Sequence, residues 1–232
     1  MKALLFDFFG TLVEYQPDRS RLGSPRSHEL ARSFGFAGDH ETFVRTWNEA
    51  SLVLERTARR TLREFSMDDA AAAFAAASNL DLTEHQVAAM GTSFVSEWAC
   101  HIQPVPGVGD LIHRLAEHWS IAVVSNTHVL DMVPNMLDDM AILPDLSTVT
   151  LSIGHGWMKP HSSIYTAALN ALDCSATEAV FIGDNYEADY AGPTRAGMHA
   201  LLIDPEAEHP IPANHRLSSV LDVAEALEID AH

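Results

Sequence analysis

A chain of 232 residues is long enough for one α/β domain with an inserted subdomain, or for two small domains. Its composition, 47% hydrophobic and 20% charged, is that of a folded globular protein and excludes a disordered or fibrous chain. With 14 Lys and Arg against 32 Asp and Glu, the net charge of −18 disfavours nucleic acids and anionic membranes as partners.

The N-terminal segment and the cysteines bear on location. Only four apolar residues stand between Lys2 and Asp7, too few for a secretory signal peptide, and no apolar run reaches membrane-spanning length. Cys100 and Cys174 lie far apart and form no CxxC motif, so neither a disulfide framework nor a zinc site is indicated. We therefore expect a cytoplasmic protein.

The first predicted element is a strand at Ala3–Phe6. This short apolar run ends at Asp7 and is followed by Gly10, which is typical of a buried parallel strand that runs into a loop. Asp7 therefore lies at the carboxyl end of a strand, where functional residues of α/β proteins are commonly found.

From residue 24 to residue 101 the sequence is rich in Ala, and apolar residues recur at helical spacing, as in Phe43, Trp47 and Leu54. About four helices are expected here. Each of three helix starts pairs a capping residue with a partner three positions on: Asp39 with Thr42, Ser66 with Asp69, and Thr83 with Gln86. The block ends at residues 104–107, where two prolines force extended backbone and a glycine frees the turn.

These boundaries predict a helical cap subdomain over residues 17–103, inserted into an α/β core formed by residues 1–16 and 104–232. An insert that leaves directly after the first strand emerges at the functional edge of the sheet. There it can exclude water and select the substrate.

Beyond residue 107, helices and apolar strands alternate. Helices are predicted near 107–118, 129–138, 161–172, 187–196 and 217–228, and strands at Ile121–Val124, Val149–Ile153, Ala179–Ile182 and Ala200–Ile203. Such alternation produces right-handed βαβ crossovers, so we predict a doubly wound, Rossmann-like parallel sheet.

Polar residues stand at or just beyond four of the strand ends: Asp7 with Thr11, Ser125 with Asn126, Lys159, and Asp184 with Asp189. Taken singly, each could be a turn residue, a helix cap or a solvated cation. Together they predict one site, because carboxylates this close repel one another unless a cation lies between them. Mg²⁺ prefers oxygen ligands and can be shared with a substrate phosphate, while a lysine offsets the remaining negative charge.

Four segments resemble, in order, the motifs of the haloacid dehalogenase superfamily: DFFGTLV at 7–13, VVSNT at 123–127, Lys159-Pro160, and GDNYEADYAGPTRAGM at 183–198. The helical block resembles the first type of cap in that family. The resemblance covers essentially the whole chain. It implies a hydrolase of the phosphatase-like branch that uses Mg²⁺ to act on a small, anionic phosphate ester.

Carried over position by position, the resemblance implies that Asp7 is the nucleophile and forms an aspartyl intermediate. Asp7, Asp184 and the backbone carbonyl of Phe9 would bind the metal. Asp189 would act through a metal-bound water or orient Lys159, which would bridge the nucleophile and the substrate. The residues implied to bind the phosphate are Thr11, Ser125, Asn126 and Lys159.

One position departs from this resemblance. Phosphatases of the family carry an Asp two residues after the nucleophile, where it protonates the leaving alkoxide, and here that residue is Phe9. A phenyl ring transfers no proton, and loss of a general acid and base typically costs about 10² to 10⁴ in rate. Three residues that lie near the four motifs in the sequence are candidates for a replacement acid: Glu14, His128 and His155.

Two other functions stay open. A 2-haloacid dehalogenase needs no such acid, since halide leaves without protonation, and that branch also has an aromatic residue at this position. It is metal-free, however, and lacks the carboxylate pair kept here as Asp184 and Asp189. A catalytically silent binding or scaffold protein would explain Phe9, but not why Asp7 and Lys159 are retained.

The acidic composition should slow the approach of an anionic substrate unless local cations reverse the potential. The candidates for that positive potential are the basic cluster of the helical block, Arg56, Arg59, Arg60 and Arg63, or Arg19 and Arg21 near the first motif. Pairing with acidic neighbours is the alternative explanation for the basic cluster.

Overall fold

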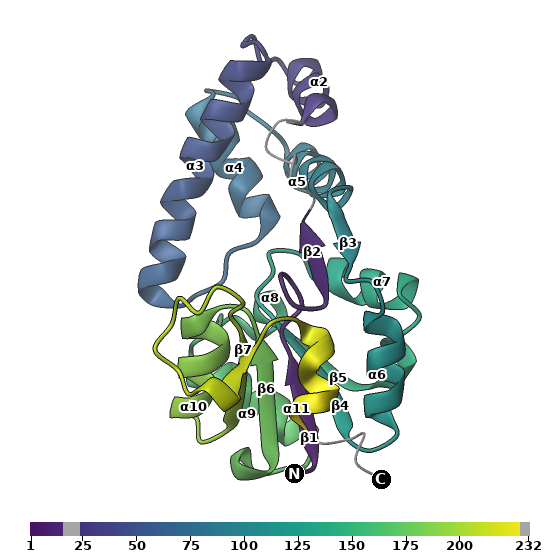
Figure 1. The fold of residues 1–232 in the computed structure, drawn as a ribbon. Coiled ribbons are helices and arrows are strands. Elements are labelled where there is room, and N and C mark those ends of the chain that lie inside the picture. The colour runs from purple at the N-terminus through teal and green to yellow at the C-terminus, as the bar shows by residue number, and fades with distance from the viewer. Residues whose placement is uncertain (16–23, 228–232) are drawn as a thin grey trace. The chain divides into compact units, whose positions relative to one another are not determined.

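The structure, a computed structural model, describes residues 1–15 and 24–227. It forms two compact units, the core unit (Met1–Glu14 with Pro104–His232) and the helical unit (Tyr15–Gln103). Two short strands, β2 (Val13–Tyr15) and β3 (Ile102–Pro104), pair where the chain passes between the units (Figure 1).

The core unit is built on one sheet with the strand order β5-β4-β1-β6-β7-β8, in which all neighbouring strands are parallel. The chain begins in the middle of the sheet, adds strands to one side, and then continues on the other. This two-way winding confirms the predicted fold class. The strands are β1 (Ala3–Phe6), β4 (Ser120–Ser125), β5 (Leu146–Leu151), β6 (Ala179–Gly183), β7 (His199–Ile203) and β8 (Arg216–Leu217).

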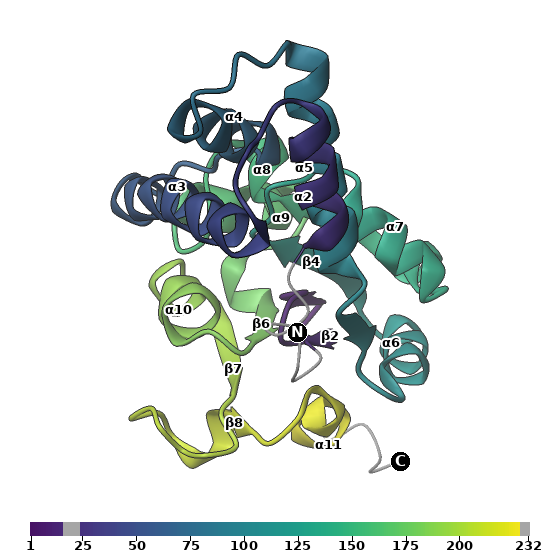
Figure 2. The ribbon, with the colours of Figure 1, turned by 90° about the horizontal axis from the view of Figure 1, so that it is seen from above.

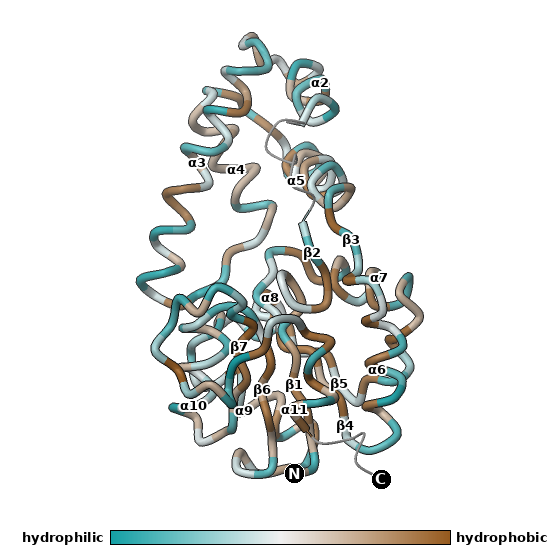
Figure 3. Tube along the Cα trace, in the orientation of Figure 1, coloured by the Kyte–Doolittle hydropathy of each residue, from teal (hydrophilic) through white to brown (hydrophobic). Residues whose placement is uncertain are grey.

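Helices cover both faces of this sheet, and α9 and α11 lie on opposite sides of it (Figures 1 and 2). On the α9 side, Ile164 and Tyr165 pack against Leu5 and Phe181 in one buried cluster. Because neither face meets water, the central strands are apolar throughout, as the hydropathy colouring shows (Figure 3). The α-helices are α6 (Val108–Ala116), α7 (Met132–Asp139), α8 (Ser152–His155), α9 (Ser162–Ala171), α10 (Gly192–Arg195) and α11 (Val223–Ala226).

Two predicted elements are wrong at their ends. The strand predicted at Val149–Ile153 is β5, which starts earlier, at Leu146, and gives way to α8 at its end. The helix predicted at 217–228 starts later, because Leu217 pairs with β7 as part of β8. A capping box at Ser219 then starts a 3₁₀ turn that leads into α11.

The helical unit contains α2 (Pro25–Ser33), α3 (His40–Thr61), α4 (Met67–Ala77) and α5 (Glu84–Ala99). The side chains of Asp39, Ser66 and Thr83 cap the starts of the last three, as their sequence pattern predicts. The four helices share one buried aromatic cluster that includes Phe43 and Phe74. Within the described ranges, no helix combines the length and apolar character that a bilayer span requires.

Candidate functional site

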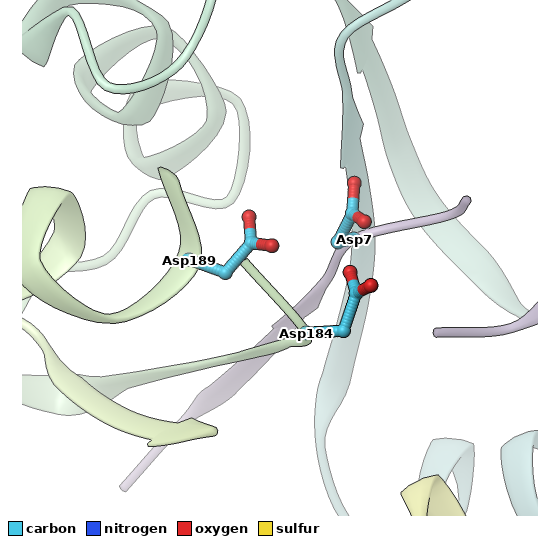
Figure 4. Close-up of side chains that lie close together, drawn as sticks. All are labelled: Asp7, Asp184 and Asp189. Carbon is cyan, nitrogen blue, oxygen red and sulfur yellow. The ribbon is translucent and has the colours of Figure 1, made fainter. Parts of the chain in front are cut away.

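Three aspartates lie together in the core unit, two of them at neighbouring strand ends and the third on a helix that follows. Asp7 directly follows β1 and Asp184 directly follows β6, and these strands are adjacent and parallel, so both carboxylates reach the same edge of the sheet. Asp189 approaches from the next helical turn (Figure 4). One oxygen from each of the three lies within 4.8 Å of the others.

Lys159 joins two of these carboxylates. Its Nζ donates to Asp7 Oδ1 and to Asp189 Oδ1, each at 2.7 Å, and the residue is only 3% exposed. The ammonium also lies 5.0 Å from the centroid of the Phe181 ring. Residues that are far apart in the sequence are thus connected by short, charge-assisted hydrogen bonds.

A π-helix at Tyr186–Ala191 sets the position of Asp189, and such helices are frequent at functional sites. The Asn185 backbone N–H donates to Asp189 Oδ2 at 2.9 Å, and the buried Tyr165 hydroxyl donates to the Ala188 carbonyl at 2.5 Å. No sequence motif marks the supporting roles of Asn185 and Tyr165, which depend on tertiary packing.

The loop after β1 approaches Asp184 closely. Gly10 has a φ of +87°, and a Cβ at this position would overlap the Asp184 carboxylate. Glycine is therefore required both by the backbone conformation and by the space beside the carboxylate. The amides of Gly10 and Thr11 donate within this turn, to Val13 O and Phe8 O.

The site holds more negative charge than one lysine can balance. Burial and the neighbouring Asp7 charge raise the pKa of Asp184 to about 6, although much of this residue's surface is exposed. Burial also raises the pKa of Asp189, against the opposing effect of Lys159. Burial alone would lower the pKa of Lys159, but the Asp189 and Asp7 charges outweigh it and the pKa is raised.

The donors present suit a hard divalent cation. Carboxylate oxygens are the ligands that Mg²⁺ prefers, and a cation would relieve the repulsion among the three aspartates. Thr11 adds a second indication, because its hydroxyl is 1% exposed and makes no hydrogen bond of good geometry, although it lies near enough to lower the Asp184 pKa slightly. The residues therefore fit a Mg²⁺ ion.

The side chains of Ser125 and Asn126 lie at the end of β4. Ser125 is fully buried, and its hydroxyl makes a long contact of 3.4 Å with the Asn126 carbonyl. The Asn126 side chain is hydrogen-bonded to the backbone of Lys159 on both sides. Both polar atoms of the Asn126 side chain are thus already hydrogen-bonded within the protein.

The position of the missing acid is occupied by an aromatic ring. Phe9 is half-buried and packs edge-to-face on Phe8 with centroids 4.9 Å apart. Among the sequence candidates for a replacement acid, His155 is hydrogen-bonded to Ser163 Oγ at 2.8 Å, Glu14 is exposed, and His128 is half-buried.

The basic cluster lies in the helical unit, on α3 and just after it. Arg59 pairs with Glu55 at 3.9 Å, one turn away, which is the intramolecular pairing considered from the sequence. Its neighbours Arg56, Arg60 and Arg63 are exposed. Arg19 and Arg21 lie outside the described residues.

Comparison with known proteins identifies the family. A family model described as haloacid dehalogenase-like hydrolase matches residues 1–197. The ribulose-1,5-bisphosphate 5-phosphatase of Halopiger xanaduensis is 28% identical over 210 residues, which cover 89% of this chain and 86% of that protein.

Two solved structures share the fold. A 2-haloacid dehalogenase from Pseudomonas syringae has a TM-score of 0.71 and 18% identity over 99% of both chains. A HAD phosphatase from Thermococcus onnurineus has a TM-score of 0.66 and 21% identity over 98% of both chains. The two neighbours perform different chemistry, so the fold alone does not decide the reaction. The match of motifs, fold and family model shows that this chain belongs to the haloacid dehalogenase-like hydrolases.

Proposed function

We propose that the protein is a Mg²⁺-dependent phosphatase that hydrolyses a small phosphate ester through an aspartyl-phosphate on Asp7. One observation carries this proposal: three carboxylates cluster around one buried lysine that bonds to only two of them, which leaves the site with an excess of negative charge. A metal-free dehalogenase would gain nothing from that excess, whereas a phosphatase needs it to hold its cation.

In this mechanism Asp7 attacks phosphorus, the bond from phosphorus to the leaving oxygen breaks, and its electron pair leaves with that oxygen. Water then attacks phosphorus, which releases phosphate and restores the Asp7 carboxylate. The proton that this water loses to the solvent balances the one that the leaving oxygen takes up from it. The hydrogen bond from Lys159 holds one Asp7 oxygen, so the carboxylate keeps one orientation throughout. The same ammonium stabilises charge on the phosphoryl oxygens.

The proposed metal ligands are Asp7, Asp184 and the Phe9 carbonyl, with Asp189 orienting Lys159. Bound there, Mg²⁺ would offset charge on the transferred phosphoryl group. Ser125, Thr11 and the Asn126 backbone are proposed to bind the remaining phosphate oxygens.

Phe9 constrains the substrate. Without an acid at this position, esters whose leaving group is stable as an anion should react fastest, because they need no proton in the transition state. The relative from Halopiger xanaduensis is named for a sugar bisphosphate, so ribulose-1,5-bisphosphate belongs in the first set of substrates tested. We also propose that residues 17–103, which lie within the helical unit, form the cap that selects the substrate, and that the enzyme acts in the cytoplasm.

The test compares phosphate release from aryl phosphates, sugar phosphates and ribulose-1,5-bisphosphate with halide release from 2-chloropropionate, each with Mg²⁺ and with EDTA. We expect phosphate release that requires Mg²⁺. Halide release that persists in EDTA would instead establish a dehalogenase. Inactivity on every substrate, together with Mg²⁺ binding, would favour the silent binding or scaffold protein.

A further inference from the structure

The side chain of Asn126 is hydrogen-bonded to both the N–H and the carbonyl of Lys159. Its Oδ1 accepts from the Lys159 backbone N–H at 2.7 Å, and its Nδ2 donates to the Lys159 carbonyl at 3.0 Å. The two residues are 33 positions apart, so these bonds tie the end of β4 to the loop that carries the lysine. A paired donor and acceptor fix the orientation of that peptide segment as well as its distance.

The residue that follows Asn126 is hydrogen-bonded to the end of another strand. The adjacent Thr127 backbone N–H donates to Ser152 Oγ at 2.9 Å, and the same hydroxyl donates to the Thr127 carbonyl at 3.3 Å. Ser152 is fully buried and Thr127 is 4% exposed, so these bonds are shielded from water. Two successive residues after β4 therefore connect the end of β5 to the lysine loop.

These hydrogen bonds restrict the backbone of a residue whose side chain is flexible. Lysine is a point charge on a flexible four-carbon stem, and nothing in the side chain fixes where its ammonium lies. Here Nζ has to reach Asp7 and Asp189 at once, at 2.7 Å from each. The ammonium can do so reproducibly only if the backbone from which it extends is fixed.

We propose that Asn126 is a positioning residue, which sets the place of the Lys159 ammonium between Asp7 and Asp189 through its side chain. The kinetic part of this inference rests on the proposed phosphatase function, whereas the structural part does not. Asn126 thereby differs from a residue whose side chain binds the substrate phosphate directly.

The composition of the chain offers a direct test, because Lys2 and Lys159 are its only lysines. Protein labelled with ¹⁵N-lysine should give two backbone amide signals, and the buried Lys159 ammonium should give a slowly exchanging signal of its own. Lys2 is a built-in control, since its side chain is 63% exposed and pairs with Glu178 away from Asn126. Lys2→Arg assigns the two signals.

In Asn126→Ala we expect faster hydrogen exchange at the Lys159 amide and loss of the slow ammonium signal, while the Lys2 signals stay unchanged. Asn126→Asp, which keeps the acceptor but not the donor, should retain amide protection; it also serves if the alanine variant does not fold. Unchanged Lys159 signals in Asn126→Ala would overturn the proposal. Asn135→Ala, at an exposed position on α7, is the matched control.

The kinetic test is a double-mutant cycle with Lys159→Ala under Mg²⁺. Asn126→Ala alone should lower kcat by about 10²-fold with KM nearly unchanged, as expected for a displaced catalytic group. In the Lys159→Ala background the same change should have almost no effect, because the group that it positions is gone. Multiplicative losses, or a rise confined to KM, would instead place the Asn126 side chain on the phosphate. A wild-type protein that releases no phosphate would refute the proposed function but leave the labelling test intact.

Discussion

Two acidic centres of this protein are built in different ways. In the helical unit, Glu97 is 5% exposed and accepts hydrogen bonds from the backbone N–H groups of Arg26 and Ser27, each at 2.8 Å, and from the Ser27 hydroxyl at 2.6 Å. In the core unit, the carboxylates of Asp7, Asp184 and Asp189 cluster together, and the Lys159 ammonium bonds to Asp7 and Asp189.

The Glu97 centre is complete without a ligand. Its backbone donors belong to the first turn of α2, where N–H groups have no partner within the helix, and the local capping residue Ser24 makes no side-chain bond to them. The carboxylate therefore meets both hydrogen-bond donors and the positive end of a helix. The aspartate cluster has no such balance, which indicates that an excess of clustered negative charge, rather than burial alone, marks the functional centre.

The largest effect is expected from Asp7→Asn. An amide oxygen is a poor nucleophile, so turnover should fall by at least about 10⁴-fold, while the fold is retained because the change is isosteric. Phosphate release and the circular dichroism spectrum are the measurements. Activity near that of the wild type would show that Asp7 is not the nucleophile. The aspartate cluster would then have no more claim to catalysis than the Glu97 centre.

The next effect concerns the acid that the site lacks. Phe9→Asp should raise the hydrolysis of alkyl phosphates by a factor of up to about 10² to 10⁴, and that of aryl phosphates much less, because only alkoxide leaving groups need a proton. The ratio of kcat/KM for the two substrate types is the readout. Equal gains on both would show that residue 9 does not reach the leaving oxygen.

Glu97→Ala tests whether the Glu97 centre has a purely structural role. It leaves first-turn amides of α2 without their acceptor and removes the bond from the Ser27 hydroxyl, so we expect a loss of about 1 to 3 kcal/mol in the free energy of unfolding. Mg²⁺ binding should not change. Urea denaturation with and without Mg²⁺ separates the two effects, and a Glu97→Ala protein of wild-type stability that no longer binds Mg²⁺ would contradict the structural role.

The smallest effect is a pH dependence at Asp184. Its folded pKa, about 6, lies above its usual value of 3.8, so without metal this group favours the fold most below about pH 4 and less as the pH rises through 6. Mg²⁺ needs the ionised form. Its affinity should therefore weaken below about pH 6, by about tenfold per pH unit.

The measurement for Asp184 is the rise in melting temperature caused by Mg²⁺, at about pH 7.5 and about pH 5.5. With a pKa of about 6, the affinity falls about fourfold between these two pH values, so we expect a larger rise at the higher pH than at the lower. Asp184→Asn should show little rise at either pH. An equal rise at both pH values in the wild type would mean that Asp184 does not hold the ion.

Much of the fold was predictable because local signals agreed with tertiary structure. The apolar run before Asp7 and the caps at Asp39, Ser66 and Thr83 are each encoded by a few adjacent residues. The end of β5 was not predictable, since Ser152 leaves the strand to bond with Thr127, a contact that no local pattern contains.

The grouping of Asp7, Lys159, Asp184 and Asp189 could likewise be foreseen, because parallel strands bring their carboxyl ends to one edge. The supporting contacts could not. That the Asn126 side chain bonds to the backbone of Lys159 depends on the path of a loop, and no residue type or spacing encodes that path.

The most direct test of the central claim is turnover in ¹⁸O-labelled water with Mg²⁺, followed by mass analysis of the phosphate and of the peptide that contains Asp7. We predict one ¹⁸O in the released phosphate and none in Asp7, because water attacks phosphorus in the aspartyl-phosphate. An ester intermediate formed by halide displacement would instead be opened at the carboxyl carbon of Asp7. Appearance of ¹⁸O in Asp7, with halide release, would therefore contradict the account.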